Sequence, residues 1–237
     1  MSHPPIRAVL FDKDGTFTDF RATWEDWMAR TIRELAAETG GVPEALADVV
    51  GIDLASGRIR PDGRFVTATN AQTAAVMAKV LDWPMARVEA WWSARVHQVR
   101  QVVVTPLDPL LAGLRTRGLR LGVLTNADAA EARRHLHALG ALPHLDRVIA
   151  CDSGYGPKPA PEGALAFAEE LGLAPREVVL VGDGMTDMRA AEGAGMRAVA
   201  VTTGTLDRAA LAPFAETVLD DIRALPGWLD RQAAPVA

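Results

Sequence analysis

The sequence predicts an α/β protein in which a parallel β-sheet carries helices on both faces and a helical segment is inserted after the first strand. Short apolar runs containing β-branched residues alternate with amphipathic helical stretches along most of the chain. Residues 20–103 contain only long amphipathic stretches, with no clear strand. We therefore expect a sheet domain made of residues 1–19 and 104–237, and an all-helical domain made of residues 20–103.

The candidate strands are short and mostly apolar. They span residues 6–11, 119–124, 147–150, 177–181, 197–201 and, more weakly, 216–219. Helical stretches follow the second, third and fourth of these runs, at residues 128–139, 161–171 and 185–194. Strands that alternate with helices in this way are typical of a parallel sheet.

The insert is expected to begin with an amphipathic helix at residues 23–39, followed by helices at residues 70–81 and 85–102. In the first helix, Trp24 and Trp27 lie at helical spacing with other apolar residues. Packing within a helical core is the simpler interpretation of these two side chains. Lining of a substrate pocket is the alternative.

Composition restricts the partners of the chain. Its 237 residues carry a net charge of −5, and no basic stripe is available for a nucleic-acid backbone. No run approaches the roughly 18 apolar residues of a membrane span, so we expect no membrane insertion. Cys151 is the only cysteine, which rules out an internal disulfide and fits a cytoplasmic location.

Polar side chains follow the predicted strands at the points where these strands end. Asp12 and Asp14 flank Lys13 directly after the first run, in the turn DKDGT. The later strands are followed by Thr125, Asn126, Lys158, Asp183 and Asp187. Because the carboxyl ends of parallel strands meet at one edge of a sheet, we expect these side chains to form one site.

The residue types at this edge indicate phosphoryl chemistry. Several carboxylates in one cleft repel each other unless a cation joins them, and oxygen ligands favour a hard ion such as Mg²⁺. Thr125, Asn126 and Lys158 can donate hydrogen bonds and positive charge to a phosphoryl group. A carboxylate such as that of Asp12 can act as a nucleophile and form an aspartyl-phosphate.

Four segments, FDKDGTFTD, LTN, GPKPAPE and GDGMTD, occur in this order, each after a predicted strand. Together they resemble the four motifs of the haloacid dehalogenase superfamily. The resemblance implies a Rossmann-like core, Asp12 as nucleophile, and Asp14 as general acid and base. It also implies that Asp12, Asp14, Asp183 and Asp187 hold Mg²⁺, Asp14 through its backbone carbonyl, while Thr125, Asn126 and Lys158 hold the phosphoryl group. The insert resembles the helical cap of this superfamily.

The position of Asp14, two residues after the expected nucleophile, distinguishes the kinds of reaction that members of the superfamily catalyse. Dehalogenases and phosphonate-cleaving members lack this aspartate, whereas a departing alkoxide needs a positioned acid. The sequence therefore favours a phosphatase acting on a small phosphorylated metabolite, and its layout resembles phosphoglycolate phosphatases. A phosphomutase of the β-phosphoglucomutase type shares both aspartates and remains the alternative. Phe17 and Phe20 depart from the commonest first motif, at the entrance to the insert.

Arginines of the insert are candidates for substrate recognition. Arg58, Arg60 and Arg64 lie in the turn-rich segment GRIRPDGR, and Arg21 lies at the entrance to the insert. A solvated loop is the simpler interpretation, but an acidic substrate needs a cationic partner. We hypothesise that Arg58 or Arg60 reads the substrate, with Arg21 as a further candidate.

Three histidines lie close together in the sequence, at His135, His137 and His144. No cysteine or carboxylate is arranged to complete a metal site with them, so we interpret them as surface or core histidines.

Overall fold

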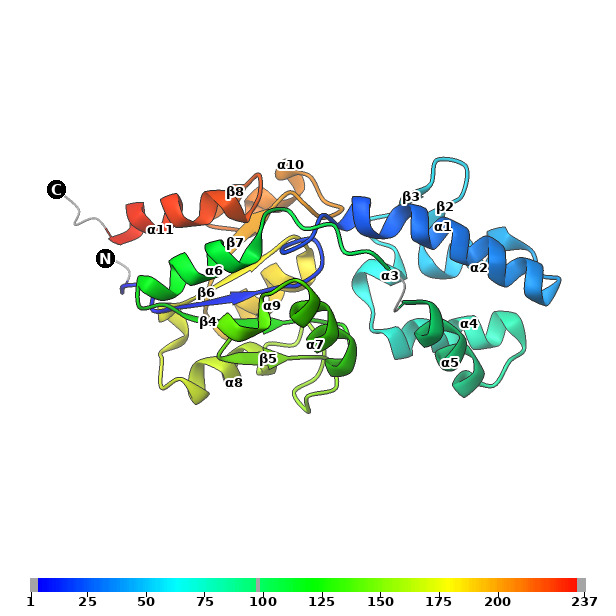
Figure 1. Ribbon diagram of the computed structural model, residues 1–237, viewed down its shortest axis with the longest axis horizontal. Helices are drawn as coiled ribbons and strands as arrows, with labels where there is room; N and C mark the ends of the chain where they lie inside the picture. Colours follow the sequence, from blue (N-terminus) through cyan, green and yellow to red (C-terminus); the bar gives the residue numbers. More distant parts are fainter. Residues whose placement is uncertain (1–3, 97–98, 234–237) are drawn as a thin grey trace. The chain divides into compact units, whose positions relative to one another are not determined.

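The computed structural model describes residues 4–96 and 99–233. The chain divides into two compact units, residues 1–19 with 103–237 and residues 20–102, which we call the sheet unit and the insert unit. The chain enters the insert unit at the point in the sequence where short apolar runs are replaced by long amphipathic stretches. Figure 1 colours both units along the chain.

The sheet unit contains a six-stranded, wholly parallel sheet with the order β5-β4-β1-β6-β7-β8. Its strands are β1 (Ala8–Phe11), β4 (Arg120–Leu124), β5 (Arg147–Ile149), β6 (Val178–Gly182), β7 (Arg197–Val201) and β8 (Thr217–Leu219). Each of the six strands overlaps an apolar run predicted from the sequence. The α/β fold with a Rossmann-like parallel sheet is therefore confirmed.

Strand β1 lies at the centre of the sheet, between β4 and β6. All four of its residues are fully buried, and its register aligns Phe11 with Val123 of β4 and with Val181 of β6. A strand covered on both faces needs apolar side chains at every position, which is why AVLF shows no alternation of polar residues.

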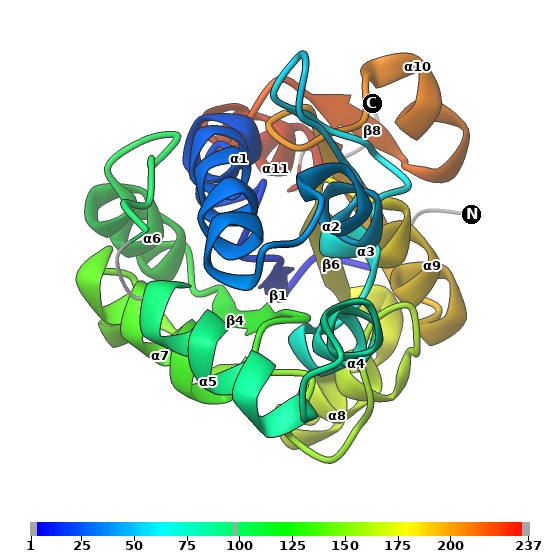
Figure 2. The ribbon, with the colours of Figure 1, turned by 90° about the vertical axis from the view of Figure 1, so that its right-hand side faces the viewer.

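Helices cover both faces of this sheet. One face, with Val9 and Phe11, packs against α6 (Leu107–Thr116), α7 (Ala129–Ala138) and α11 (Leu225–Ala233). The other face, with Ala8 and Leu10, packs against α8 (Glu162–Glu170) and α9 (Met185–Ala194). Figure 2 shows the central strands between α6 and α7 on one side and α8 and α9 on the other. The short helix α10 (Arg208–Leu211) follows β7.

The insert unit is built from α1 (Phe20–Thr39), α2 (Pro43–Val50), α3 (Arg64–Thr67), α4 (Asn70–Leu81) and α5 (Met85–Val96). Its core is rich in aromatic rings that meet edge to face or tilted. Trp24 contacts Trp27 and Phe65, and Trp27 contacts Trp92. Trp24 and Trp27 are buried in this core, so packing is the role that the structure gives them.

The expectation of an all-helical insert needs one correction. Strands β2 (Ile52–Asp53) and β3 (Arg58–Ile59) form a short antiparallel pair. The Asp53 carboxylate accepts hydrogen bonds from the backbone N–H groups of Ala55 and Ser56, which stabilises the turn between the strands. Two-residue strands of this kind leave no periodic signal in a sequence.

Helix α5 also ends earlier than predicted, at Val96 instead of residue 102. Residues 99–102 are not helical, and residues 97–98 lie outside the described part of the chain. The run after the helix is rich in valine, whose branched side chain favours extended backbone.

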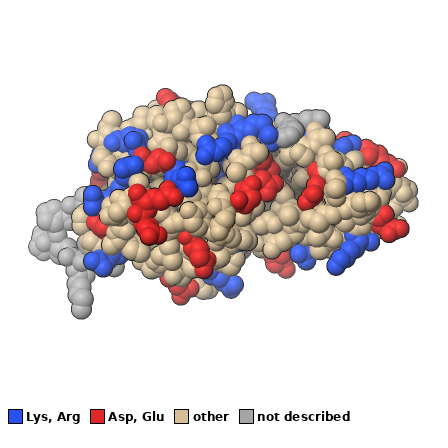
Figure 3. Space-filling model, turned by 90° about the horizontal axis from the view of Figure 1, so that it is seen from below, with Lys and Arg blue, Asp and Glu red and all other residues tan. Residues whose placement is uncertain are grey.

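The charged side chains are mixed in sign. On the face drawn in Figure 3, acidic and basic residues are interspersed among larger areas of other side chains. Among the described residues, none of the helices combines the length and the hydropathy that a membrane crossing requires.

The packing of α8 on the sheet generates a stability prediction. Phe167 is fully buried, whereas Leu165 on the same helix is 39% exposed. Phe167→Ala should lower the free energy of unfolding by about 3–5 kcal/mol because it leaves a cavity, and Leu165→Ala should change it by less than about 1 kcal/mol. Urea unfolding of both variants measures the difference, and equal losses would show that α8 does not pack as described.

Candidate active site

Asp12 follows the last residue of β1 and lies at the carboxyl edge of the sheet. Its backbone N–H donates to the Val181 carbonyl at 2.8 Å, which extends the β1–β6 ladder by one residue. Its Oδ1 accepts from the Lys13 N–H at 2.6 Å and lies 2.7 Å from Lys158 Nζ. Burial raises the pKa of Asp12 to about 7. The positive charge of Lys158 acts to lower this pKa, and the negative charge of Asp187 acts to raise it.

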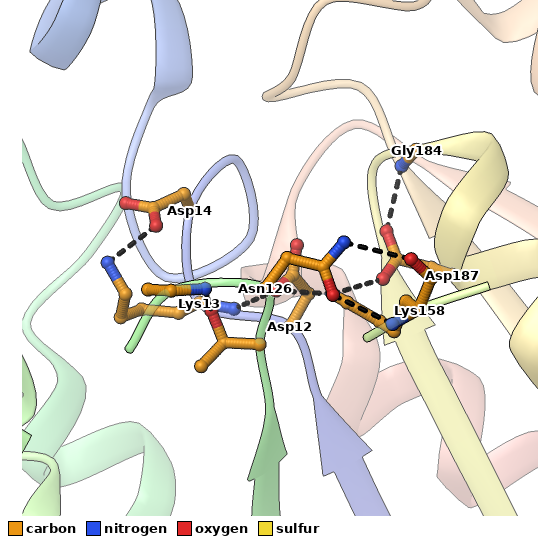
Figure 4. Close-up of polar contacts among 9 residues, drawn as sticks. Asp12, Lys13, Asp14, Asn126, Lys158, Gly184 and Asp187 are labelled. Atoms are coloured by element: carbon orange, nitrogen blue, oxygen red, sulfur yellow. Dashed lines mark hydrogen bonds and ion pairs between the residues drawn. The ribbon is translucent and has the colours of Figure 1, made fainter. Parts of the chain in front are cut away.

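Lys158 reaches Asp12 from the loop that follows β5. The residue is 97% buried, and its ammonium lies 2.7 Å from Asp12 Oδ1 and 2.6 Å from Asp187 Oδ1. Burial alone would lower the pKa of Lys158, but the charges of Asp12 and Asp187 raise it above its usual value. The lysine is therefore a permanent cation held between two carboxylates, as the close-up in Figure 4 shows.

Asn126, which follows β4, fixes the backbone of Lys158. The Asn126 amide Nδ2 donates to the Lys158 carbonyl at 2.9 Å, and the Lys158 N–H donates back to Asn126 Oδ1 at 2.8 Å. The amide group of Asn126 therefore holds this loop, and the binding of phosphate by Asn126 stays a prediction. Thr125 is buried at the end of β4, with its Oγ1 accepting from the Ala127 N–H at 3.2 Å.

Asp187 belongs to the first turn of α9. Its Oδ2 accepts from the Gly184 N–H at 3.0 Å, and its Oδ1 binds Lys158. It therefore stabilises the start of the helix and anchors the lysine with one carboxylate.

Asp183 follows β6 and is buried in a tight cradle. Burial raises its pKa well above the usual value, and the charges of Asp12 and Asp187 raise it further. A Cβ added at Gly15, whose φ is +77°, or at Gly204 would collide with the Asp183 carboxylate. The glycine of DKDGT is thus required by the close approach of this side chain as well as by its backbone conformation.

Asp14 also lies at this edge, and its carboxylate points to Lys13. The distance from Lys13 Nζ to Asp14 Oδ2 is 2.5 Å, and Lys13 Nζ lies 3.2 Å from Nδ1 of His135 on α7. Neither Lys13 nor His135 has a site role among the sequence-based predictions, and His135 is a buried histidine, one of the two interpretations given for it. The only sign of a role for Lys13 in the sequence is its position, since this charged residue lies just two positions after the end of the fully apolar strand β1.

The arginines proposed for substrate recognition lie in the insert unit, and three of the four lie beside a carboxylate. Arg21 and Arg58 both pair with Glu25, Arg58 at 3.0 Å. Arg60 lies 3.4 Å from Asp48. Arg60 and Arg64 also line a polar pocket of about 240 Å³ within this unit.

The carboxylates of the sheet unit suit a divalent metal ion. Asp12, Asp183 and Asp187 each offer an oxygen, and these atoms lie within 4.8 Å of one another. Burial raises the pKa of both Asp12 and Asp183, and repulsion from neighbouring carboxylates raises it further, so a divalent cation would relieve the unfavourable charge of this cluster. Hard oxygen donors of this kind fit Mg²⁺ or a similar ion.

The chain matches the haloacid dehalogenase-like hydrolase family over residues 6–195, and it belongs to that family. A parallel α/β sheet with acidic residues at its carboxyl edge is consistent with this assignment. Together with phosphatases among its relatives, the family defines the chain as an enzyme of the phosphatase class.

Two of these relatives align with nearly the whole chain. The phosphoglycolate phosphatase of Rhodospirillum rubrum is 29% identical over 231 residues, which cover 94% of this chain and 90% of that protein. The N-acetylmuramic acid 6-phosphate phosphatase of Pseudomonas aeruginosa is 31% identical, with 98% of each protein covered. The crystal structure of a HAD phosphatase from Thermococcus onnurineus is similar with a TM-score of 0.69 and 26% identity, covering 94% of this chain and 98% of that one.

The raised pKa values generate a prediction for metal binding. In the unfolded chain Asp12 loses its proton near pH 4, whereas in the folded, metal-free site it keeps the proton until about pH 7, so its contribution to stability without metal falls as the pH rises through this window. A divalent cation replaces this proton. Millimolar Mg²⁺ should therefore raise Tm clearly at about pH 8 and much less at about pH 5.5, as scanning calorimetry would measure.

Two variants control this experiment. Asp183→Asn removes one buried charge and should lose most of the Mg²⁺-dependent rise in Tm. Asp230→Asn changes a side chain that is 66% exposed and should keep the full rise. The same rise in Asp183→Asn as in the wild type would contradict metal binding at this cluster.

Proposed function

We propose that this protein hydrolyses the phosphate monoester of a small carboxylic acid, using Asp12 as the nucleophile and Mg²⁺ as the cofactor. The observation that carries the proposal is the buried Asp12 carboxylate, held 2.7 Å from the ammonium of Lys158 and grouped with two further carboxylates. Asp12, Asp183 and Asp187 are the residues that would hold the metal, together with the backbone carbonyl of Asp14. Asp187 already binds Lys158 and Gly184, which favours a supporting role for it.

In the first step, one oxygen of Asp12 attacks the phosphorus atom and the bond from phosphorus to the leaving oxygen breaks. Asp14 gives its proton to that oxygen, so the product leaves as an alcohol. Lys158 and Thr125 bind the oxygens of the phosphoryl group while it is transferred. Mg²⁺, when bound, would neutralise part of the negative charge shared by the phosphoryl group and the aspartates.

In the second step, Asp14 takes a proton from a water molecule that attacks the phosphorus of the aspartyl-phosphate. The bond between phosphorus and the Asp12 oxygen breaks, which releases inorganic phosphate and restores the Asp12 carboxylate. The same residue serves as acid and then as base, because the proton lost in the first step is regained in the second.

The names of two relatives support the proposed substrate class. Glycolate and muramic acid, the parent compounds in the names of the two aligned phosphatases, are both carboxylic acids. A phosphorylated carboxylic acid carries a carboxylate charge in addition to the charge of its phosphate, and this carboxylate needs a cationic partner when it leaves water. The arginines of the insert are candidates for that partner. A cytoplasmic location, where such metabolites occur, is part of the proposal.

The two aspartates of the first motif should respond differently to amidation. Asp12→Asn removes the nucleophile and should reduce kcat to below about 10⁻³ of the wild-type value, with the fold retained. Asp14→Asn should lower kcat/KM strongly for alkyl phosphates and much less for aryl phosphates, whose leaving groups need less protonation. Phosphate release measures both variants.

Asp220→Asn is the matched control, because this side chain is 90% exposed in the same unit, and it should retain full activity. Substantial turnover by Asp12→Asn would mean that another group is the nucleophile. Analysis of the products separates hydrolysis from the phosphomutase alternative, since a mutase would return the phosphoryl group to the sugar and release little phosphate.

Substrate discrimination should depend on an arginine of the insert. Replacement of the responsible residue, Arg58 or Arg60 by our hypothesis, with Ala should lower kcat/KM for the best acidic substrate by roughly 10- to 100-fold, because a charge-assisted contact contributes about 1.5–3 kcal/mol. Hydrolysis of a neutral aryl phosphate should change little. Arg21→Ala and Arg64→Ala complete the set.

Arg30→Ala is the control for this set. Arg30 is exposed on α1, and the hydrogen bond described for it goes to the Asp26 carbonyl of the same helix. Equal losses on both substrates would indicate a disturbed insert unit. If none of the four variants lost activity selectively, the arginine hypothesis would be wrong.

A further inference from the structure

Two of the three lysines in the chain are buried in the candidate active site, and only one of them, Lys158, has a role in the proposed mechanism. The other is Lys13, whose side chain is fully buried between the sheet and α7. An ammonium group removed from water is costly unless it is paired. Its contacts therefore indicate what it does.

The Lys13 ammonium joins Asp14 to α7. On one side it lies 2.5 Å from Asp14 Oδ2, and on the other it lies 3.2 Å from His135 Nδ1. An ammonium can only donate, so Nδ1 of His135 accepts and its proton is on Nε2. His135 is itself buried on α7, with the buried Glu131 one turn earlier at 3.9 Å.

The direction of the Lys13 side chain follows from β1. Residues of a strand alternate between the two faces of a sheet, and Val9 and Phe11 point to the face covered by α7. Two residues beyond Phe11, Lys13 lies on this same side, where α7 presents His135. Asp12 and Asp14 thus belong to one turn but bind different lysines, as Figure 4 shows.

We propose that Lys13 is a positioning residue for Asp14, and that His135 in turn holds Lys13. This inference rests on the proposed function, in which Asp14 moves the protons. Lys13 has no exposed surface with which to touch substrate, so it acts through the carboxylate beside it. The Lys13 ammonium lies 2.5 Å from Asp14 Oδ2, which limits the positions of the carboxyl group and leaves its other oxygen to carry the proton, and proton transfer to a leaving oxygen requires such control.

The test compares leaving groups. Lys13→Met keeps the length of the side chain and removes its charge. It should lower kcat/KM for alkyl phosphates by roughly 10- to 100-fold and for an aryl phosphate by no more than about threefold, because only the poor leaving group depends on a well-placed acid. This is the pattern expected of Asp14→Asn. A purely structural role would lower both values equally.

Variants of His135 provide a second, independent arm. His135→Leu removes the acceptor and should reproduce the selective loss for alkyl phosphates, by roughly 3- to 10-fold. His135→Gln restores an oxygen acceptor for the ammonium and should recover most of that loss. His137→Leu is the matched control, because His137 is exposed on the same helix, and it should leave both rates unchanged.

The outcomes separate this inference from the proposed function. Selective loss in Lys13→Met and His135→Leu, with recovery in His135→Gln, supports the positioning role. Asp14→Asn can lose activity selectively on alkyl phosphates while the folded Lys13 and His135 variants lose activity on alkyl and aryl phosphates equally, or lose none. In that case the inference is wrong and the proposed function stands. If Asp14→Asn itself is not selective, the proposed function fails first. Should Lys13→Met not fold, the two His135 variants decide the question.

Discussion

The ion pairs of Lys158 with Asp12 and Asp187 connect the loops that follow β1, β5 and β6. Each of these groups is buried, so none of the charges could remain there alone without a large cost in solvation free energy. The lysine is in turn held by the paired hydrogen bonds of its backbone with Asn126 after β4. Four strand ends are thus joined through one lysine residue, three by its ammonium group and the fourth by its backbone, and the rest of the site is arranged around it.

Strand order places these loops together. Because β1 lies between β4 and β6, the residues that follow the three strands are neighbours, and the loop after β5 needs to cross only one strand to reach Asp12. The apolar faces of the sheet, packed by helices on both sides, keep the strand ends in register. Charge repulsion among the aspartates remains after this assembly, and it is the physical reason why the site suits a divalent cation.

Much of this arrangement could be predicted from the sequence. The apolar run before DKDGT predicts the central strand because a strand buried on both faces has no room for polar residues, and the strand–helix alternation predicts a parallel sheet. Asp12, Lys158, Asp183 and Asp187 could be placed at one edge from this topology alone. Their roles in catalysis stay predictions.

Other features could not be predicted because they depend on contacts between distant segments. The pair formed by Lys13 and His135 joins residues 122 positions apart, and nothing in the local sequence indicates that α7 turns His135 toward the first motif. The binding of Asn126 to the Lys158 backbone depends likewise on the path of the loop after β5. The β2–β3 pair is too short for periodicity to reveal it, and its turn is stabilised by local hydrogen bonds of Asp53 and Ser56, which resemble many other polar residues of the sequence.

The central claim is that Asp12 forms a covalent bond to phosphorus. Rapid acid quenching of the enzyme during turnover of a phosphorylated carboxylic acid, followed by mass spectrometry of its peptides, tests this claim most directly. The account predicts a peptide containing Asp12 that is heavier by one phosphoryl group, that hydroxylamine converts to the aspartyl hydroxamate with release of phosphate, and that is absent from Asp12→Asn. Steady release of phosphate with no phosphorylated peptide at any quench time, or with the label on another residue, would contradict it.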